Sequence, residues 1–265
     1  MMDYGMPTLI ENDNIMETVK LCNNLGFQFV ELNMNLPQYQ ITGLKQYDSL
    51  QKIAKEYGIY YTIHLDENLN IWDFNLEVAA AYRNTVKESI KVAKELHIPI
   101  LNMHMNPGVY FTLPSKKVYL YEQYMEQYIE DTIAFRTMCE EAIGDEDIRI
   151  CIENTEGYTT YQREAVRQLL ESNVFGLTWD IGHSYVADNK DENFLLEYQG
   201  HLNHFHIHDG KGIKNHMALG TGEIDLQKYL SLAEHKNCRC VIETKTVQAL
   251  WESLDWLKAK GYIEI

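Results

Sequence analysis

The chain has 265 residues, 45% of them hydrophobic and 23% charged, as in a globular protein with a sizeable core. Its formal net charge of −16 disfavours binding to nucleic acid phosphates and to anionic membrane surfaces. No apolar run approaches the ~20 residues that a membrane helix needs, no signal peptide is visible, and the five scattered cysteines are typical of reduced thiols. We therefore expect a cytoplasmic protein that acts away from membranes and is a poor partner for nucleic acid.

Short apolar runs alternate with helix-length segments along the whole chain. The predicted strands are 4–10, 27–35, 59–66, 98–106, 148–156, 175–184, 202–209 and 239–246. The predicted helices are 13–25, 46–57, 76–96, 119–143, 161–172, 191–200, 226–236 and 247–260. The clearest is 76–96, which carries an apolar stripe at helical spacing formed by Val78, Tyr82, Val86, Ile90 and Ala93.

This alternation predicts an α/β fold, a single (β/α)8 TIM barrel with a parallel eight-stranded barrel and outer helices. One domain over 1–265 is expected, because no linker or low-complexity segment divides the chain. An open, doubly wound sheet is the alternative. It is less favoured because no glycine-rich phosphate turn follows the first predicted strand.

Polar side chains end seven consecutive predicted strands, at the face where such barrels carry their active sites. They are Glu31, His64, His104, Glu153, Asp180 with His183, His206, and Glu243. Each of these residues, taken alone, is equally well explained as a core residue whose hydrogen bonds are made or as a surface residue. His201 and His204 are interpreted as solvated residues. Together, however, four acids and four histidines at one barrel mouth would repel one another and lose hydration at a high cost in free energy unless a cation were bound. The pattern therefore indicates at least one divalent metal ion.

Motifs in a fixed order support a family resemblance over nearly the whole chain. They read VELN, IHLDEN, NMHMNPG, IENTEG, WDIGHSY, HIHDGKG, NHMALGTGEIDL and IETKT. In this order they resemble the xylose-isomerase-like barrels, a superfamily of sugar isomerases and epimerases, inosose-processing enzymes and endonuclease IV-type nucleases. The resemblance implies a metal position at Glu153, Asp180, His206 and Glu243. Three carboxylates and one imidazole suit Mn²⁺, Mg²⁺, Co²⁺ or, less selectively, Zn²⁺.

The first functional hypothesis is a metal-dependent isomerase or epimerase of a small sugar, polyol or related hydroxy-carbonyl compound. The resemblance to epimerases implies that Glu153 and Glu243 are acid and base. His183 is expected to hold a substrate hydroxyl, and Lys211 or Lys214 to bind a distal oxygen or a phosphate. Without a further basic cluster, a non-phosphorylated substrate is favoured. Whether the protein forms a homo-oligomer is left open.

The loop 106–124 is long and aromatic. Two of its residues, Tyr110 and Phe111, are candidates for one wall of the substrate pocket. Packing over the barrel rim is an equally good explanation for these two side chains.

The second hypothesis is a multi-zinc phosphodiester hydrolase acting on abasic DNA or on a small phosphodiester. Endonuclease IV-like enzymes hold three zinc ions, and His64, His104, His183 and His216 resemble ligand positions of that type. Lys214 stands where that family has an aspartate, so a full third zinc site is in doubt. A single metal is favoured, with these histidines as substrate-oxygen donors. A third hypothesis is a non-enzymatic barrel that binds a sugar or metal, although a degenerate binder is expected to lose ligands that this chain keeps.

Overall fold

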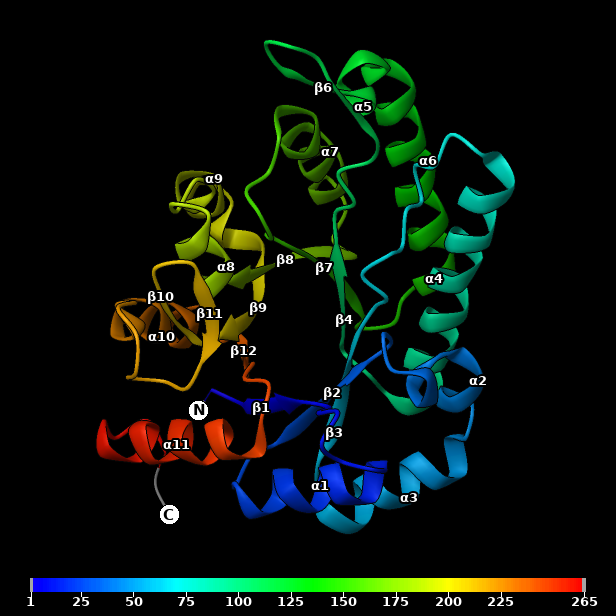
Figure 1. Ribbon diagram of the computed structural model, residues 1–265. Coiled ribbons are helices and arrows are strands. Elements are labelled where there is room, and N and C mark those ends of the chain that lie inside the picture. Colours follow the sequence, from blue (N-terminus) through cyan, green and yellow to red (C-terminus); the bar gives the residue numbers. More distant parts are fainter. Residues whose placement is uncertain (1, 264–265) are drawn as a thin grey trace.

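In the described part of the chain, residues 2–263 of a computed structural model, eight parallel strands form a closed barrel (Figure 1). The barrel strands are β1 (Tyr4–Pro7), β2 (Phe29–Asn33), β3 (Tyr60–His64), β4 (Ile100–His104), β7 (Arg149–Glu153), β8 (Phe175–Asp180), β9 (Leu202–Ile207) and β12 (Arg239–Ile242). Their order is β1-β12-β9-β8-β7-β4-β3-β2, and β1 pairs with both β12 and β2, which closes the ring. The predicted TIM barrel is confirmed.

Helices surround the barrel as an outer layer (Figure 1). They are α1 (Ile15–Asn24), α2 (Ile41–Leu44), α3 (Tyr47–Tyr57), α4 (Leu76–Leu96), α5 (Leu120–Gln123), α6 (Met125–Ile143), α7 (Thr160–Leu170), α8 (Ile181–Val186), α9 (Glu192–Glu197), α10 (Leu226–His235) and α11 (Val247–Ala259), with 3₁₀ turns at Pro37–Tyr39 and Gln199–His201. No helix in residues 2–263 is both long enough and apolar enough to cross a bilayer.

The long helix α4 shows how the apolar pattern builds this layer. Asn75 caps its first turn by accepting a hydrogen bond from the backbone of Glu77, and Val86, Ile90 and Ala93 are buried. Val78, at the start of the predicted stripe, is 37% exposed. A helix of 21 residues is ~30 Å long, longer than a five-residue strand, so its first turn extends past the barrel wall.

Strand β9 has two differently packed faces. Phe205 packs with its ring centroid 6.0 Å from that of Trp179, which in turn lies 5.2 Å from Tyr229 of α10. This face therefore points toward the helices. The alternating residues His204 and His206 are fully buried in the barrel interior, as expected for side chains that alternate along a strand.

Four features above the barrel differ from the predicted elements. The strand predicted to reach residue 184 ends at Asp180, because that side chain accepts the backbone N–H of His183 and starts α8. The helix predicted over 119–143 is divided into α5 and α6 at Tyr124. Two antiparallel hairpins were not predicted: β5 (Tyr110–Thr112) with β6 (Lys117–Tyr119), and β10 (Asp209–Lys211) with β11 (Lys214–Met217).

Candidate metal centre

Four side chains from neighbouring strand ends converge on one point inside the barrel mouth. One ligand atom from each of Glu153, Asp180, His206 and Glu243 lies within 4.8 Å of the corresponding atoms of the other three. Nδ1 of His206 is 3.1 Å from Glu243 Oε2, 3.3 Å from Glu153 Oε1 and 3.8 Å from Asp180 Oδ2. All four side chains are buried. The structure thus brings together the four residues that the motif order implied.

Strand register explains this convergence. Asp180 on β8 is paired with His206 on β9, and Glu153 on β7 is paired with His104 on β4. Glu243 directly follows β12. Parallel strands that end at a common level present their last side chains to the same side of the barrel, so residues distant in sequence share one site.

The electrostatics of this cluster favour a bound cation. Burial alone would raise the carboxyl pKa values of Glu153 and Glu243, but the His206 imidazole holds both well below their usual range. Burial would lower the pKa of His206, whereas the carboxylates of Glu153, Glu243 and Glu31 raise it well above its ordinary value. These opposite shifts have one cause: positive charge at the centre of the cluster stabilises the surrounding carboxylates.

Unpartnered atoms test whether a metal ion fits here. His206 Nδ1 and Glu243 Oε2 are buried and make no hydrogen bond within the described residues, although they lie only 3.1 Å apart. Both are metal-ligand atoms, and with the oxygens of Glu153 and Asp180 they form a hard, oxygen-rich donor set. Such a set fits a divalent cation such as Mn²⁺, Mg²⁺, Co²⁺ or Zn²⁺.

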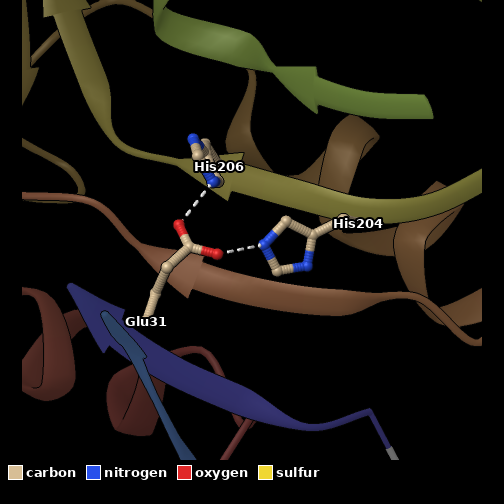
Figure 2. A group of neighbouring side chains, drawn as sticks. All are labelled: Glu31, His204 and His206. Carbon is tan, nitrogen blue, oxygen red and sulfur yellow. Dashed lines mark hydrogen bonds and ion pairs between the residues drawn. The ribbon is translucent and has the colours of Figure 1, made fainter. Parts of the chain in front are cut away.

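A buried carboxylate contacts the other ring nitrogen of His206 (Figure 2). Glu31 Oε1 lies 2.9 Å from His206 Nε2, and Oε2 lies 2.9 Å from His204 Nε2 and accepts a 2.9 Å hydrogen bond from Thr62. The His206 contact is an ion pair without hydrogen-bond alignment. Glu31 therefore places negative charge on the Nε2 side of the ring while Nδ1 faces the acid cluster.

His204 corrects one expectation. The sequence pattern indicated a solvated residue, but its side chain is fully buried and contacts Glu31 (Figure 2). Burial lowers the pKa of His204, even though Glu31 acts in the opposite direction. The alternation of β9 places His204 on the same face as His206, which indicates a side chain inside the barrel but does not identify Glu31 as its partner.

A second cluster shares Glu153 with the first. Glu153 Oε2 lies 3.0 Å from His104 Nε2 and 3.5 Å from His64 Nε2, and it also accepts a hydrogen bond from Asn102. His64 donates its Nδ1 hydrogen to the carbonyl of Leu65. Burial would lower the pKa of His64, but the neighbouring Glu153 carboxylate raises it to about 9. The group His64, His104 and Glu153 has ligand atoms close enough for a second ion.

His183 and His216 lie on the wall of the cavity above the metal centre. The backbone N–H of His183 donates to Asp180 Oδ1 at 2.6 Å, and the two histidine rings meet edge to face at 5.4 Å. His216 donates its Nδ1 hydrogen to the carbonyl of Glu243 at 3.0 Å. Burial lowers the pKa of His216 to about 4. His216 is thus neutral near pH 7, with Nε2 as an acceptor.

His208 was not predicted as a site residue. It is fully buried, and its Nε2 lies 3.0 Å from Asp180 Oδ2. The alternation of the stretch HFHIHD places it on the same face as His206, which was the only sequence signal for its position.

The cavity at the carboxyl end of the barrel has a volume of about 550 Å³. It lies in the size range of small-molecule sites. Its lining includes His64, His104, Glu153, His183, His216 and Glu243 from the clusters above. Further lining residues are Glu67, Asn68, Asn106, Pro107, Glu156 and Lys245 from loops, Tyr119 from the end of β6 and Gln162 from α7.

The lysines are placed differently from the sequence-based expectation. Lys211 and Lys214 are exposed and are not among the residues that line this cavity. Lys211 lies 3.6 Å from Glu223 instead. The lysine on the cavity wall is Lys245, which donates to Glu243 Oε1 at 3.2 Å. Lys245 lies in the motif IETKT, shortly after β12 ends at Ile242. The motif alone did not predict that this lysine lines the cavity.

The aromatic wall of the cavity comes from Tyr119 rather than from the two earlier candidates. Tyr110 and Phe111 are 45% and 58% exposed and lie on β5, paired with β6 in the hairpin that projects above the barrel (Figure 1). Tyr110 is directly opposite Tyr119 in this hairpin. The two rings lie on the same face of this unpredicted hairpin, with their centroids 5.4 Å apart, and of the two Tyr119 lines the cavity.

The fold and the ligand cluster together define a TIM barrel with a candidate divalent-metal centre at the carboxyl ends of its strands. Residues 19–260 match the family model described as xylose isomerase-like TIM barrel. The chain therefore belongs to this family. A curated relative, the uncharacterized protein MJ1311 of Methanocaldococcus jannaschii, is 24% identical over 220 residues, which cover 75% of this chain and 72% of that protein.

Solved structures with the same fold include sugar epimerases. A D-tagatose 3-epimerase-like protein superposes with a TM-score of 0.77 and 21% identity, covering 97% of this chain and 96% of that chain. The 3-keto-D-glucoside 4-epimerase YcjR of E. coli gives 0.76 and 16%, covering 98% and 100%. D-psicose 3-epimerase of Clostridium cellulolyticum H10 with D-tagatose gives 0.74 and 15%, covering 99% of each chain. At these identities the likeness shows the fold.

Proposed function

We propose that the protein is a metal-dependent isomerase or epimerase of a sugar or a related polyol or hydroxy-carbonyl compound. One observation carries the proposal. Glu153 and Glu243 line the same cavity from β7 and from the end of β12, and each directs one oxygen toward Nδ1 of His206. Strands β8 and β9 separate these two positions around the barrel, so the two carboxylates face a ligand from different sides.

The reaction moves a proton to and from a carbon atom beside a carbonyl group. One carboxylate removes the proton, and a second, protonated carboxyl group returns one from the other side. Glu153, Asp180, His206 and Glu243 would hold a divalent cation, which would supply polarisation of the carbonyl and the adjacent hydroxyl of the substrate. Each glutamate keeps one oxygen away from His206: Oε2 of Glu153 contacts His104, and Oε1 of Glu243 contacts Lys245. These are the oxygens that we assign to proton transfer.

The cavity wall favours a neutral substrate rich in hydroxyl groups. The neutral His216 presents an acceptor nitrogen, and Asn68 and Asn106 supply amide groups. Among the described residues that line the cavity, Lys245 is the one lysine or arginine, and it is already engaged by Glu243. Phosphate recognition ordinarily uses several positive or N–H donors, so we expect a non-phosphorylated substrate.

Solvent exchange tests the proposed reaction across many compounds at once, before the substrate is identified. Metal-loaded protein is incubated in D₂O with a panel of ketoses, aldoses, inososes and keto-glycosides, and proton NMR follows deuterium entry beside the carbonyl. We expect exchange and a new stereoisomer for at least one compound. Glu156→Gln is the matched control, because Glu156 lines the cavity but belongs to neither metal cluster. The absence of exchange across the panel would contradict the proposal.

The shared carboxylate of Glu153 supports a second candidate, phosphodiester hydrolysis at two metal ions. The groups His64–His104–Glu153 and Glu153–Asp180–His206–Glu243 have this residue in common, and two-metal hydrolases use ions ~3.5–4 Å apart. Elemental analysis of metal-loaded protein separates the candidates. About one ion per chain supports the isomerase, whereas two zinc ions together with cleavage of a small phosphodiester support the hydrolase.

A further inference from the structure

Asp180 is held by two different donors, and one of them has no role in the proposed function. The backbone N–H of His183 donates to Oδ1, and His208 contacts Oδ2 through Nε2 at 3.0 Å. His208 is fully buried and is not among the residues that line the cavity. It therefore acts on the site through Asp180 rather than on a substrate.

The hydrogen bonds of His208 fix its tautomer. Its Nδ1 lies 2.7 Å from the backbone nitrogen of His216, whose N–H can only donate. Nδ1 is therefore the acceptor, and the ring hydrogen is on Nε2, directed at Asp180 Oδ2. Because both ring nitrogens are used, His208 is not free to bind a metal ion, although its position beside His216 and Glu243 resembles a ligand group.

Packing holds the same ring in place. The His208 and His216 rings stack at 4.1 Å with an interplanar angle of 22°. A Cβ atom on residue 182 would also overlap the His208 ring, so Gly182 at the start of α8 allows the close approach. One imidazole thus connects a strand end, the first turn of α8 and the β10–β11 hairpin.

We propose that His208 is a positioning residue that orients Asp180 for the metal and places His216 on the cavity wall. The inference rests on the proposed function, because it assigns His208 a part in that metal centre and that substrate pocket. Its two nitrogens serve the two tasks separately: the Nε2 hydrogen fixes the carboxylate, and the Nδ1 lone pair fixes the backbone of His216. Partners that orient metal ligands typically change metal affinity by about 10–100-fold when they are replaced.

Two substitutions separate the two tasks. In His208→Asn, the side-chain oxygen is close to the position of Nδ1 and still accepts from His216, but no donor reaches Asp180. In His208→Gln, the amide nitrogen is close to the position of Nε2 and still donates to Asp180, but no acceptor remains for His216. His235→Asn and His235→Gln are matched controls, because His235 is exposed at the end of α10.

Metal affinity is measured on the full chain by titration with Co²⁺ in the absence of substrate, with the unfolding temperature of the metal-free variants as the check on folding. We expect His208→Asn to bind Co²⁺ about 10–100-fold more weakly, and His208→Gln to bind it like the wild type. For a sugar that shows exchange, we expect His208→Gln to raise KM about tenfold, the effect of one lost hydrogen bond, with a smaller change in kcat.

Wild-type Co²⁺ affinity in His208→Asn, or equal losses in the Asn and Gln variants, would overturn the inference. A wild-type protein that binds no divalent metal would overturn the metal centre and this inference together. A wild-type protein that binds metal but exchanges no sugar proton would contradict the proposed reaction alone, since the two Co²⁺ affinities still decide whether His208 orients Asp180.

Discussion

Glu31 and His206 form an ion pair at 2.9 Å (Figure 2), and neither residue is among those that line the cavity. The pair places a carboxylate at Nε2 of an imidazole whose Nδ1 faces three further carboxylates. A carboxylate behind a metal-binding histidine fixes the ring orientation and increases the basicity of the ligand nitrogen. We therefore expect Glu31 to support the candidate metal centre through His206, although it does not line the cavity.

Glu31→Gln is predicted to weaken metal binding by about 10–100-fold, because the isosteric amide keeps the shape but removes the charge at Nε2. Co²⁺ titration measures the change. Thr62→Val is the matched control, since it removes only one hydrogen bond to Glu31 Oε2 and leaves the charge in place. Equal effects of the two substitutions would contradict a role for the charge.

Glu153→Gln and Glu243→Gln are each predicted to lower turnover at least ~10²-fold, because each removes a proton-transfer group as well as a negative metal ligand. Turnover is compared with that of Glu156→Gln, which changes an exposed acid of the same cavity. Turnover close to the wild-type value in either ligand variant, measured at saturating metal, would argue against the assigned roles.

Metal affinity is predicted to increase with pH across the neutral range. Burial would lower the pKa of His206, but Glu153 and Glu243 raise it well above its ordinary value, so the metal-free site holds a proton that the metal must displace. Metal affinity therefore rises with pH and stops rising once the pH lies well above the pKa of His206. His216 contributes no proton here, since burial lowers its pKa to about 4.

Calorimetric titration in two buffers of different ionisation enthalpy measures this proton release directly. About one proton per bound metal is expected near neutral pH. Metal binding that takes up protons, or that is independent of pH, would be the opposite result.

The protein is predicted not to nick duplex DNA that carries one abasic site at physiological salt. A duplex binder neutralises ~6–10 phosphates with basic side chains, whereas this chain has a net charge of −16. Zinc-loaded protein and a labelled duplex give the measurement on a denaturing gel. Efficient nicking, with no proton exchange on any sugar, would favour the multi-zinc hydrolase instead.

The barrel was predictable because its signals are local and repeated. Each strand is an apolar run, and Asp180 and His206 each mark the end of such a run in the sequence. In parallel strands, side chains at the ends meet at one face regardless of their distance along the chain. Residue type and strand position therefore indicated a cluster of acids and histidines at this face, and the family resemblance implied the four of them that the structure brings together, Glu153, Asp180, His206 and Glu243.

Contacts that depend on non-local geometry were not predictable. The burial of His204 depends on the distance across the barrel to Glu31, which alternation along one strand does not give. The position of His208 depends on the missing Cβ of Gly182 and on the turn of the β10–β11 hairpin. The place of Tyr119 on the cavity wall likewise depends on where the β5–β6 hairpin lies at the barrel mouth, which no local sequence pattern gives.

The four candidate ligands all come from strands β7, β8, β9 and β12, in the second half of the chain, whereas β1 closes the ring between β12 and β2. A bound ion would consequently act as a cross-link within the carboxy-terminal half. Local opening of β7, β8, β9 and β12 would require loss of the ion. The backbone amide hydrogens of these strands should therefore exchange with solvent more slowly in the metal-bound protein than in the metal-free protein. Helices α1 and α3 pack outside the amino-terminal strands, and their amide hydrogens should exchange at nearly the same rate with and without metal. Hydrogen exchange would then distinguish the two halves of one barrel by how strongly the ion slows their local opening.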